Sequence, residues 1–127
     1  GEVDITKSET LISIGRGIGE EENLEMVHKL AQTMGADVAC SRPIVDTKWL
    51  EKCRQVGTSG QTVKPKVYLA LGISGSFQHM GGIKGNPFII AVNKNPTAPI
   101  FQRADVGVVA DILEFIPTLT EKVAQAR

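Results

Sequence analysis

Short apolar runs alternate along this chain with glycine-containing turns and with amphipathic stretches. Residues 67–71 and 88–92 are nearly continuous apolar runs, which are typical of parallel strands covered on both faces. The runs at residues 11–14, 37–40 and 106–109 are shorter, and we predict that they are strands as well. The hydrophobic pattern therefore predicts five β-strands.

Apolar residues change to helical spacing between several of these strands. From residue 20 to residue 34, apolar side chains recur every three or four positions, and Gly35 supplies a helix end. A second helix is predicted from Asp111 onward, with Pro117 either kinking it or beginning a further helix. Residues 76–80 have room for only one or two helical turns.

The segment after the second strand carries its own signals. Pro43 cannot donate a strand hydrogen bond, and Asp46 can cap a short helix around Trp49. Proline also favours an extended backbone at the preceding Arg42, whose guanidinium would then be aimed at a ligand; an ordinary surface arginine is the alternative. Residues 54–65 are too polar and glycine-rich for a regular element, so we predict a loop held by contacts elsewhere.

Strands that alternate with helices predict an α/β domain. We expect an open, mostly parallel, Rossmann-like sheet with flanking helices and right-handed crossovers. The 127 residues suffice for one hydrophobic core. We expect residues 11–127 to form this domain, and residues 1–10 to be a linker or the remnant of a longer chain, because the sequence begins with glycine rather than methionine.

Composition argues against several classes of function. Fourteen basic residues balance fourteen acidic ones and aromatic residues make up 5%, so neither nucleic acid nor an anionic membrane surface is an expected partner. Cys40 and Cys53 lack the spacing of a zinc site or a disulfide framework, which favours reduced, buried thiols. No segment resembles a membrane span or a signal peptide, so we expect a soluble, intracellular protein.

Polar residues or glycines follow every predicted strand at its carboxyl end. The carboxyl ends of parallel strands share one edge of the sheet, where ligands bind against loops and helix N-termini. Loops are also polar because they face water, but the pattern favours a nucleotide-like site. The candidates at this edge are Gly15, Arg16, Ser41, Arg42, residues 72–74, Asn93 and Asp111.

Two glycine-rich motifs at this edge point to different roles. GRGIG (15–19) spaces its glycines differently from the dinucleotide fingerprint, and a tight strand-to-helix turn explains it equally well. In GISGS (72–76), Ser74 and Ser76 can cap the following helix, and glycine lets a phosphate approach backbone amides; a capped turn without a ligand is the alternative. Neither a nucleophile elbow nor a lysine-bearing P-loop occurs, so the edge suits a cofactor that supplies its own reactivity.

Five longer motifs carry a family resemblance. They are SRPIVD (41–46), QVGTSGQTV (55–63), PKVYLALGISG (65–75) with Gln78 and His79 after it, NKNPTAPIF (93–101) and ADVGVVAD (104–111). From about residue 11 to about residue 121, the chain closely resembles the C-terminal FAD-binding domain of electron transfer flavoprotein α-subunits, the family that includes the bacterial FixB proteins. The resemblance implies an open α/β sheet that binds FAD.

The resemblance also implies individual roles around the flavin. Arg42 matches an arginine placed against the flavin ring, Ser59 a hydroxyl near flavin N5, and His79 a donor toward flavin O2. Asn93 and Asp111 match residues on the phosphate, ribose and adenine side. No catalytic or metal-binding residue is implied. The implied cofactor-binding residues are Ser41, Arg42, Gln55, Val56, Gly57, Thr58, Ser59, Gly72, Ser74, Gly75, Gln78, His79, Asn93 and Asp111.

One motif departs from the family pattern. The chain reads QVGTSG where the family commonly reads QVGQTG. Ser59 keeps a hydroxyl, whereas Thr58 replaces a glutamine amide and loses whatever contacts that amide makes. We therefore do not expect this chain to share the redox potential of its relatives.

For the whole protein, the resemblance implies an electron carrier without substrate chemistry of its own. Its implied partners are the electron transfer flavoprotein β-subunit, flavoprotein dehydrogenases and a quinone reductase, or other redox partners in electron-bifurcating members. The implied location is the cytoplasm of a bacterium or archaeon, or the mitochondrial matrix of a eukaryote. A nicotinamide-dependent enzyme domain, with His79 as acid or base, is the alternative hypothesis. A domain that binds nothing in isolation is a third.

Overall fold

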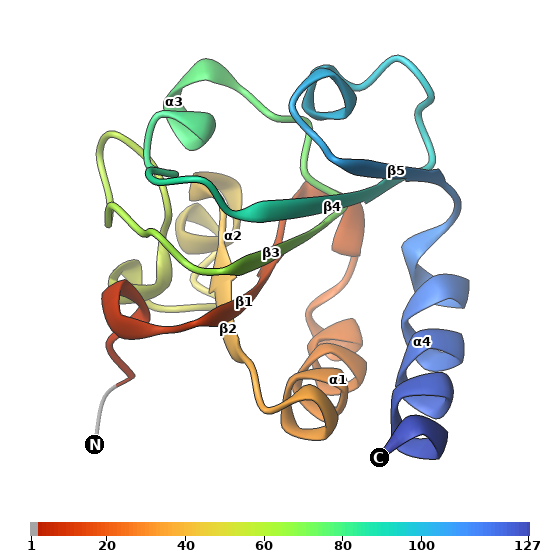
Figure 1. The fold of residues 1–127 in the computed structure, drawn as a ribbon. Coiled ribbons are helices and arrows are strands. Elements are labelled where there is room, and N and C mark those ends of the chain that lie inside the picture. Colours follow the sequence, from red (N-terminus) through yellow and green to blue (C-terminus); the bar gives the residue numbers. More distant parts are fainter. Residues whose placement is uncertain (1–2) are drawn as a thin grey trace.

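Five parallel strands form one sheet. The computed structural model describes residues 3–127, and the strand order is β2-β1-β3-β4-β5 (Figure 1). Every neighbouring pair is parallel, which confirms the predicted α/β fold. The strands, each within one residue of its predicted bounds, are β1 (Thr10–Ile14), β2 (Asp37–Cys40), β3 (Val67–Leu71), β4 (Phe88–Asn93) and β5 (Val106–Val109).

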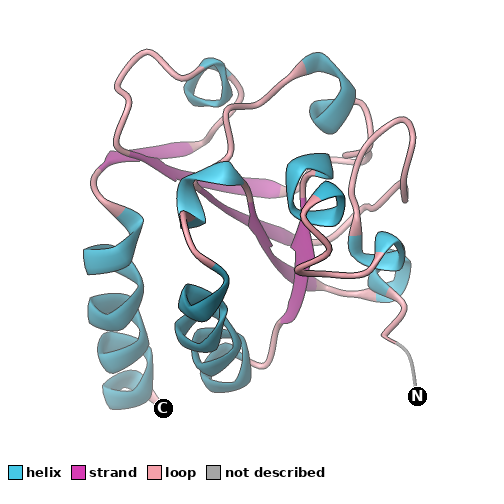
Figure 2. Ribbon diagram, turned by 180° about the vertical axis from the view of Figure 1, so that it is seen from behind, coloured by secondary structure: helices cyan, strands magenta, loops and turns pink. Residues whose placement is uncertain are grey.

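Helices cover the two faces of the sheet unequally. The two long helices, α1 (Leu24–Met34) and α4 (Ile112–Ala126), lie side by side against one face, as Figures 1 and 2 show from opposite directions. The short α2 (Arg42–Asp46) adds Ile44 to the same core. The opposite face is covered by α3 (Phe77–Met80) and by loops rather than by a long helix.

The two-residue period of a strand divides the apolar side chains between two cores. Ile12 and Ile14 of β1 pack with α1 and α4, whereas Leu11 packs on the opposite face. Ile5, ahead of β1, and Tyr68 of β3 also belong to this second core. Because both faces are buried, the strands need apolar residues at successive positions, which is the pattern that predicted them.

The helix after β2 differs from its prediction. We predicted an extended Arg42 and a short helix around Trp49 capped by Asp46, and both expectations are wrong. Arg42 begins α2, Asp46 is its last residue, and Trp49 lies beyond it in a turn. Proline is compatible with the first turn of a helix, where its missing N–H has no partner to lose, so Pro43 fits inside α2. The extended conformation falls on Ser41 instead (φ −88°, ψ 166°).

Two other helix predictions are refined by the structure. Pro117 lies within α4, which continues as one helix over Ile112–Ala126, so no second helix begins there. The helix predicted from residue 20 begins with a 3-10 turn at Glu21–Asn23, and regular α-helix starts at Leu24. Gly35 ends α1 in the left-handed conformation (φ 70°), as its position predicted.

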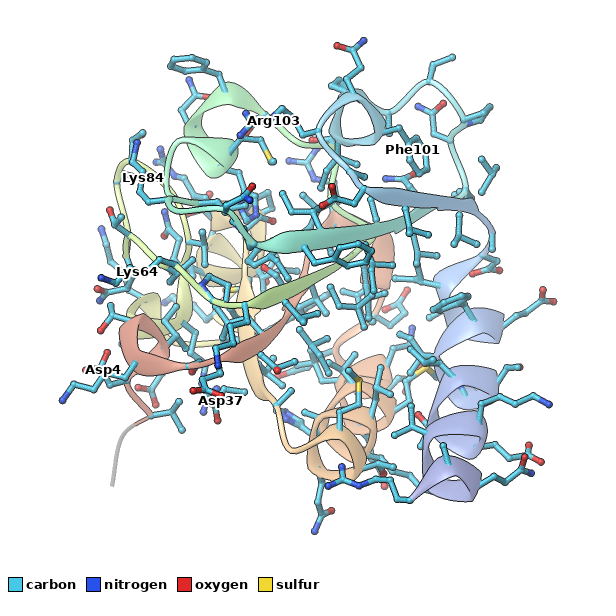
Figure 3. All side chains as sticks on the ribbon, in the orientation of Figure 1. Asp4, Asp37, Lys64, Lys84, Phe101 and Arg103 are labelled. Carbon is cyan, nitrogen blue, oxygen red and sulfur yellow. The ribbon has the colours of Figure 1, made fainter. Side chains whose placement is uncertain are left out.

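The turn Pro99–Gln102 joins the edge strand to the loop after β3. Its Phe101 packs against β5, where a Cβ on Gly107 would lie 2.8 Å from Phe101 Cδ1 (Figure 3). The amide of Ile100, in the same turn, donates to the carbonyl of Ser74 at 2.8 Å. This turn therefore fixes the position of the loop that carries the GISGS motif.

None of the helices within residues 3–127 is long and apolar enough to cross a membrane. In the same part of the chain, no three metal-ligating side chains gather into a cluster. Cys40 is buried as predicted, and burial raises the pKa of its thiol to about 12. Cys53 is half-buried rather than buried.

Candidate functional site

A cavity of about 790 Å³ lies at the carboxyl end of the sheet. The loops after β1, β2, β3 and β4 line it, so it occupies the edge where the sequence predicted a site. A volume of this size is within the range of small-molecule and cofactor pockets. Eleven of the fourteen predicted residues line it: Ser41, Arg42, Gln55, Val56, Gly57, Ser59, Gly72, Ser74, Gln78, His79 and Asn93.

Nine further lining residues were absent from the set that the resemblance assigned to FAD. Arg16 and Ile73 were nevertheless candidates from the strand-end pattern, and Ser76 was expected to cap the following helix. Lys94 and Asn95 directly follow Asn93, so the same signal extends to them. Asp46 was expected to be a helix cap. The nine residues are Arg16, Gly17, Gly19, Pro43, Asp46, Ile73, Ser76, Lys94 and Asn95.

Three predicted residues lie outside the cavity lining. The amide of Thr58 donates to the carbonyl of Gln78 at 2.9 Å, so this exposed residue joins two lining loops. Gly75 adopts φ +91° and packs directly against Ile100. Asp111 begins α4, where its carboxylate accepts a hydrogen bond from Leu113. Their observed contacts are within the fold, and their roles toward FAD stay predictions.

Replacing Asp111 by alanine should lower the free energy of unfolding by about 0.5–2 kcal/mol, because the Leu113 amide loses the side-chain acceptor at 2.9 Å. Urea unfolding measures this change. Asp111→Asn is the matched control, because asparagine is as good a cap as aspartate. The cap role is wrong if the asparagine and alanine variants lose the same stability.

The polar loop between β2 and β3 is held by hydrogen bonds at both ends. The Val56 amide donates to the Cys40 carbonyl at 2.9 Å, which extends the sheet edge by one bridge. Gln55 is buried, and its Nε2 donates to Ser59 Oγ at 3.0 Å. With the Thr58 contact to α3, these bonds confirm the expectation that this loop is held by contacts elsewhere. Ser59 is thereby placed at the cavity.

Backbone contact between the first and third loops explains the GRGIG motif. The Gly17 amide donates to the Gly72 carbonyl at 3.0 Å. A Cβ on Gly72 would lie 2.8 Å from Gly17 Cα, and one on Gly15 would lie 2.6 Å from the Gly72 carbonyl oxygen. Gly72 also adopts φ +68°, which disfavours any side chain there. The close approach of the two loops supports the interpretation of GRGIG as a tight turn.

His79 lies at the buried end of the cavity. It is 4% exposed, and Ser76 Oγ accepts from its backbone amide at 3.3 Å, which confirms the predicted Ser76 cap. Nε2 is 2.7 Å from the Tyr68 hydroxyl, whereas Nδ1 is buried without a hydrogen-bond partner among residues 3–127. Burial lowers the pKa of His79 to about 4, and the main chain of Val56 opposes this shift in part. The ring is therefore neutral at neutral pH and can donate through only one nitrogen.

Charged side chains around the cavity are mainly basic. Arg16, Arg42 and Lys94 line it together with a single acidic residue, Asp46. Arg42 Nε lies 3.6 Å from Asp46 Oδ2, but the arginine side chain is 71% exposed, and such pairs contribute little stability. The arginine therefore remains available to an anionic or electron-rich ligand.

Asn93 joins the loops after β3 and β4. Its Nδ2 donates to the Ile73 carbonyl at 3.1 Å, and its Oδ1 accepts from the Asn95 amide at 2.9 Å. This side chain thus holds the two loops together while it lines the cavity. Its polar atoms are already engaged, and Asn95 Oδ1 accepts from the amide and hydroxyl of Thr97, so Lys94 offers the freer side chain at the same place.

Comparison with known proteins identifies the family. Residues 4–84 match the family model described as the electron transfer flavoprotein FAD-binding domain. Protein FixB of Salmonella typhimurium is 49% identical over 124 residues, and protein FixB of Escherichia coli strain K12 is 46% identical over the same length. Each match covers 97% of this chain and 40% of the FixB protein, so the chain spans about two fifths of these relatives. A nicotinamide-dependent enzyme domain is not favoured by these matches. The chain belongs to the electron transfer flavoprotein FAD-binding domain family, and its cofactor is FAD.

Proposed function

We propose that this chain is the FAD-binding part of an electron transfer flavoprotein α-subunit, which carries electrons and performs no substrate chemistry of its own. Bound FAD supplies the reversible uptake of electrons. The observation that carries the proposal is the cavity at the carboxyl edge of the sheet, in a chain of this family, lined by eleven of the residues that the resemblance assigned to FAD.

The donor set of the cavity fits a flavin nucleotide. His79 keeps one buried ring nitrogen without a partner in the described chain, and a flavin carbonyl is an acceptor that could pair with it. Ser59 Oγ accepts from Gln55 Nε2, so its own hydroxyl hydrogen stays available for a flavin nitrogen. We assign Arg42 to the flavin ring, where a permanent positive charge favours the reduced cofactor.

The other end of the cavity fits the pyrophosphate. The amides of Gly17 and Gly72 are already bonded to the carbonyls of Gly72 and Val92, so charged side chains rather than these amides would hold the phosphates. Arg16 and Lys94 add two positive charges from different loops. Guanidinium and ammonium groups stabilise phosphate oxygens by charge-assisted hydrogen bonds. We therefore assign the loops after β1 and β4 to the phosphate side.

The partners follow from the family and are part of the proposal. We propose an electron transfer flavoprotein β-subunit as the heterodimer partner, with flavoprotein dehydrogenases as donors and a quinone reductase or another redox protein as acceptor. The named FixB relatives are bacterial, so we propose a cytoplasmic location. A mitochondrial matrix location would follow only for a eukaryotic source.

Titration of the 127-residue chain with FAD tests the proposed function. We expect saturable binding with a shifted flavin absorption spectrum and changed flavin fluorescence, because the ring moves from water into the cavity. NAD is the control ligand and should not compete at the same concentration. Selective NAD binding without FAD uptake would favour the enzyme alternative. If FAD binds only after the β-subunit is added, the site is completed by the partner.

A further inference from the structure

A buried hydroxyl lies behind His79. Tyr68, the second residue of β3, is completely buried, and its hydroxyl is 2.7 Å from His79 Nε2. The two rings are tilted by 52° with centroids 6.0 Å apart, so they meet through this polar contact rather than by stacking. Burial raises the pKa of Tyr68, which keeps the hydroxyl protonated. The Tyr68 hydroxyl and the His79 ring are therefore both neutral, and one hydrogen-bonding proton lies between the Tyr68 oxygen and His79 Nε2.

The direction of this hydrogen bond follows from the shortage of other partners. If Nε2 carried the ring proton, it would donate to the Tyr68 oxygen, and the phenolic O–H would then need another acceptor. The Ser13 side chain interacts with the Tyr68 hydroxyl strongly enough to lower its pKa in part against burial, but Ser13 Oγ lies outside hydrogen-bonding geometry to every group among residues 3–127. A buried O–H without an acceptor is strongly unfavourable. Donation from Tyr68 to Nε2 avoids it.

The ring proton of His79 is then left on Nδ1. A neutral imidazole carries one N–H, and the hydrogen bond at one nitrogen decides which nitrogen has it. The main chain of Val56 raises the pKa of the ring in part against burial, but this effect does not distinguish the two nitrogens. Nδ1 is the ring nitrogen without a hydrogen-bond partner in the described chain, and His79 lines the cavity. The only donor that the ring can offer a ligand is thus Nδ1–H.

We infer that Tyr68 is a positioning residue that fixes the ring tautomer of His79, so that Nδ1–H is the donor presented to the cofactor. The inference rests on the proposed function for its link to FAD, but the tautomer itself is a property of the chain without cofactor. Tyr68 itself makes no proposed contact with the flavin. Its effect on the cofactor is exerted through the ring of His79.

Nitrogen-15 NMR of the cofactor-free chain tests the tautomer directly. The chain has two histidines, and the exposed His28, which lies outside the cavity, serves as an internal reference. At neutral pH we expect His79 to show a protonated Nδ1 and an unprotonated Nε2 in the wild-type chain. A wild-type spectrum with the proton on Nε2, or averaged over both nitrogens, would overturn the inference without any variant.

Tyr68→Phe removes the hydroxyl and keeps the ring that fills the second core. We expect His79 to lose the single-tautomer pattern, with the His28 signals unchanged and the amide spectrum still folded. Ser13→Ala is the matched control, because it removes the other buried hydroxyl that acts on Tyr68; if Tyr68 donates to Nε2, His79 should keep its single tautomer in this variant. An unchanged His79 pattern in folded Tyr68→Phe would contradict the positioning role.

Redox titration of the FAD-loaded chain supplies a second readout. Tyr68→Phe should lower the potential in the same direction as His79→Ala, and the double variant should show no loss beyond that of His79→Ala alone. Additive shifts would mean that Tyr68 acts independently of His79. If the wild-type chain binds FAD neither alone nor with the β-subunit, the proposed function fails, while the NMR result on the tautomer still stands or falls separately.

Discussion

We expect Gly75→Ala to lower the free energy of unfolding by about 2–6 kcal/mol. The backbone at Gly75 adopts φ +91°, a conformation that costs a residue with a side chain about 1–3 kcal/mol. A Cβ there would also lie 2.6 Å from Ile100 Cα and 2.7 Å from Ile100 N. These are main-chain atoms of a buried residue, so the clash is not relieved by a side-chain rotation, and overpacking adds about 1–3 kcal/mol.

Gly35→Ala is the control that separates these two terms. Gly35, at the end of α1, adopts a similar positive φ of +70°, but a Cβ added to it would meet no atom within 4 Å. Its replacement should therefore lose only about 1–2 kcal/mol, from the backbone term. Urea unfolding of both variants, with unchanged m-values, measures the difference. Equal losses would show that contact with Ile100 contributes nothing.

The Gly75 result bears on how the loop after β3 is shaped. The resemblance assigned Gly75 to FAD, but the structure places it against the turn Pro99–Gln102. The Ile100 amide donates to Ser74 beside it. A glycine at this position thus allows a second loop to pack closely enough to hold the GISGS backbone.

Most of the fold was predictable because it depends on patterns that are local in sequence. Continuous apolar runs such as residues 67–71 predicted the parallel strands, since both faces of such a sheet are covered. The order of the strands was not predicted, because it depends on which apolar faces meet in space. The helix around Trp49 was wrong because Pro43 suggested a break, although a proline in the first helical turn loses no hydrogen bond.

The candidate site was predictable where it follows from strand ends. Parallel strands bring Ser41, Gly72 and Asn93 to one edge of the sheet independently of the loop conformations. All three residues line the cavity. Tyr68 could not be found in this way, because a tyrosine within an apolar run indicates only a core residue. Its contact with His79 depends on where α3 folds back over the sheet, which the sequence pattern does not specify.

Replacing His79 by alanine should lower the reduction potential of bound FAD by about 60–130 mV. Electron uptake places negative charge on the flavin, and a hydrogen bond to a charged group is worth about 1.5–3 kcal/mol. For a one-electron couple, about 59 mV corresponds to a tenfold change in equilibrium, or about 1.4 kcal/mol. The neutral ring of His79 suffices for this effect, because the donated N–H rather than a full charge stabilises the reduced flavin.

Two further variants make the redox experiment decisive. His28→Ala removes the exposed histidine outside the cavity and should leave the potential unchanged. His79→Gln keeps an N–H donor on a flexible side chain and should recover part of the loss. Because His79→Ala also leaves the Tyr68 hydroxyl without its partner, stability must be measured beside the potential. A folded, FAD-loaded His79→Ala chain with an unchanged or higher potential would remove His79 from the control of electron uptake, whatever the variant does to stability.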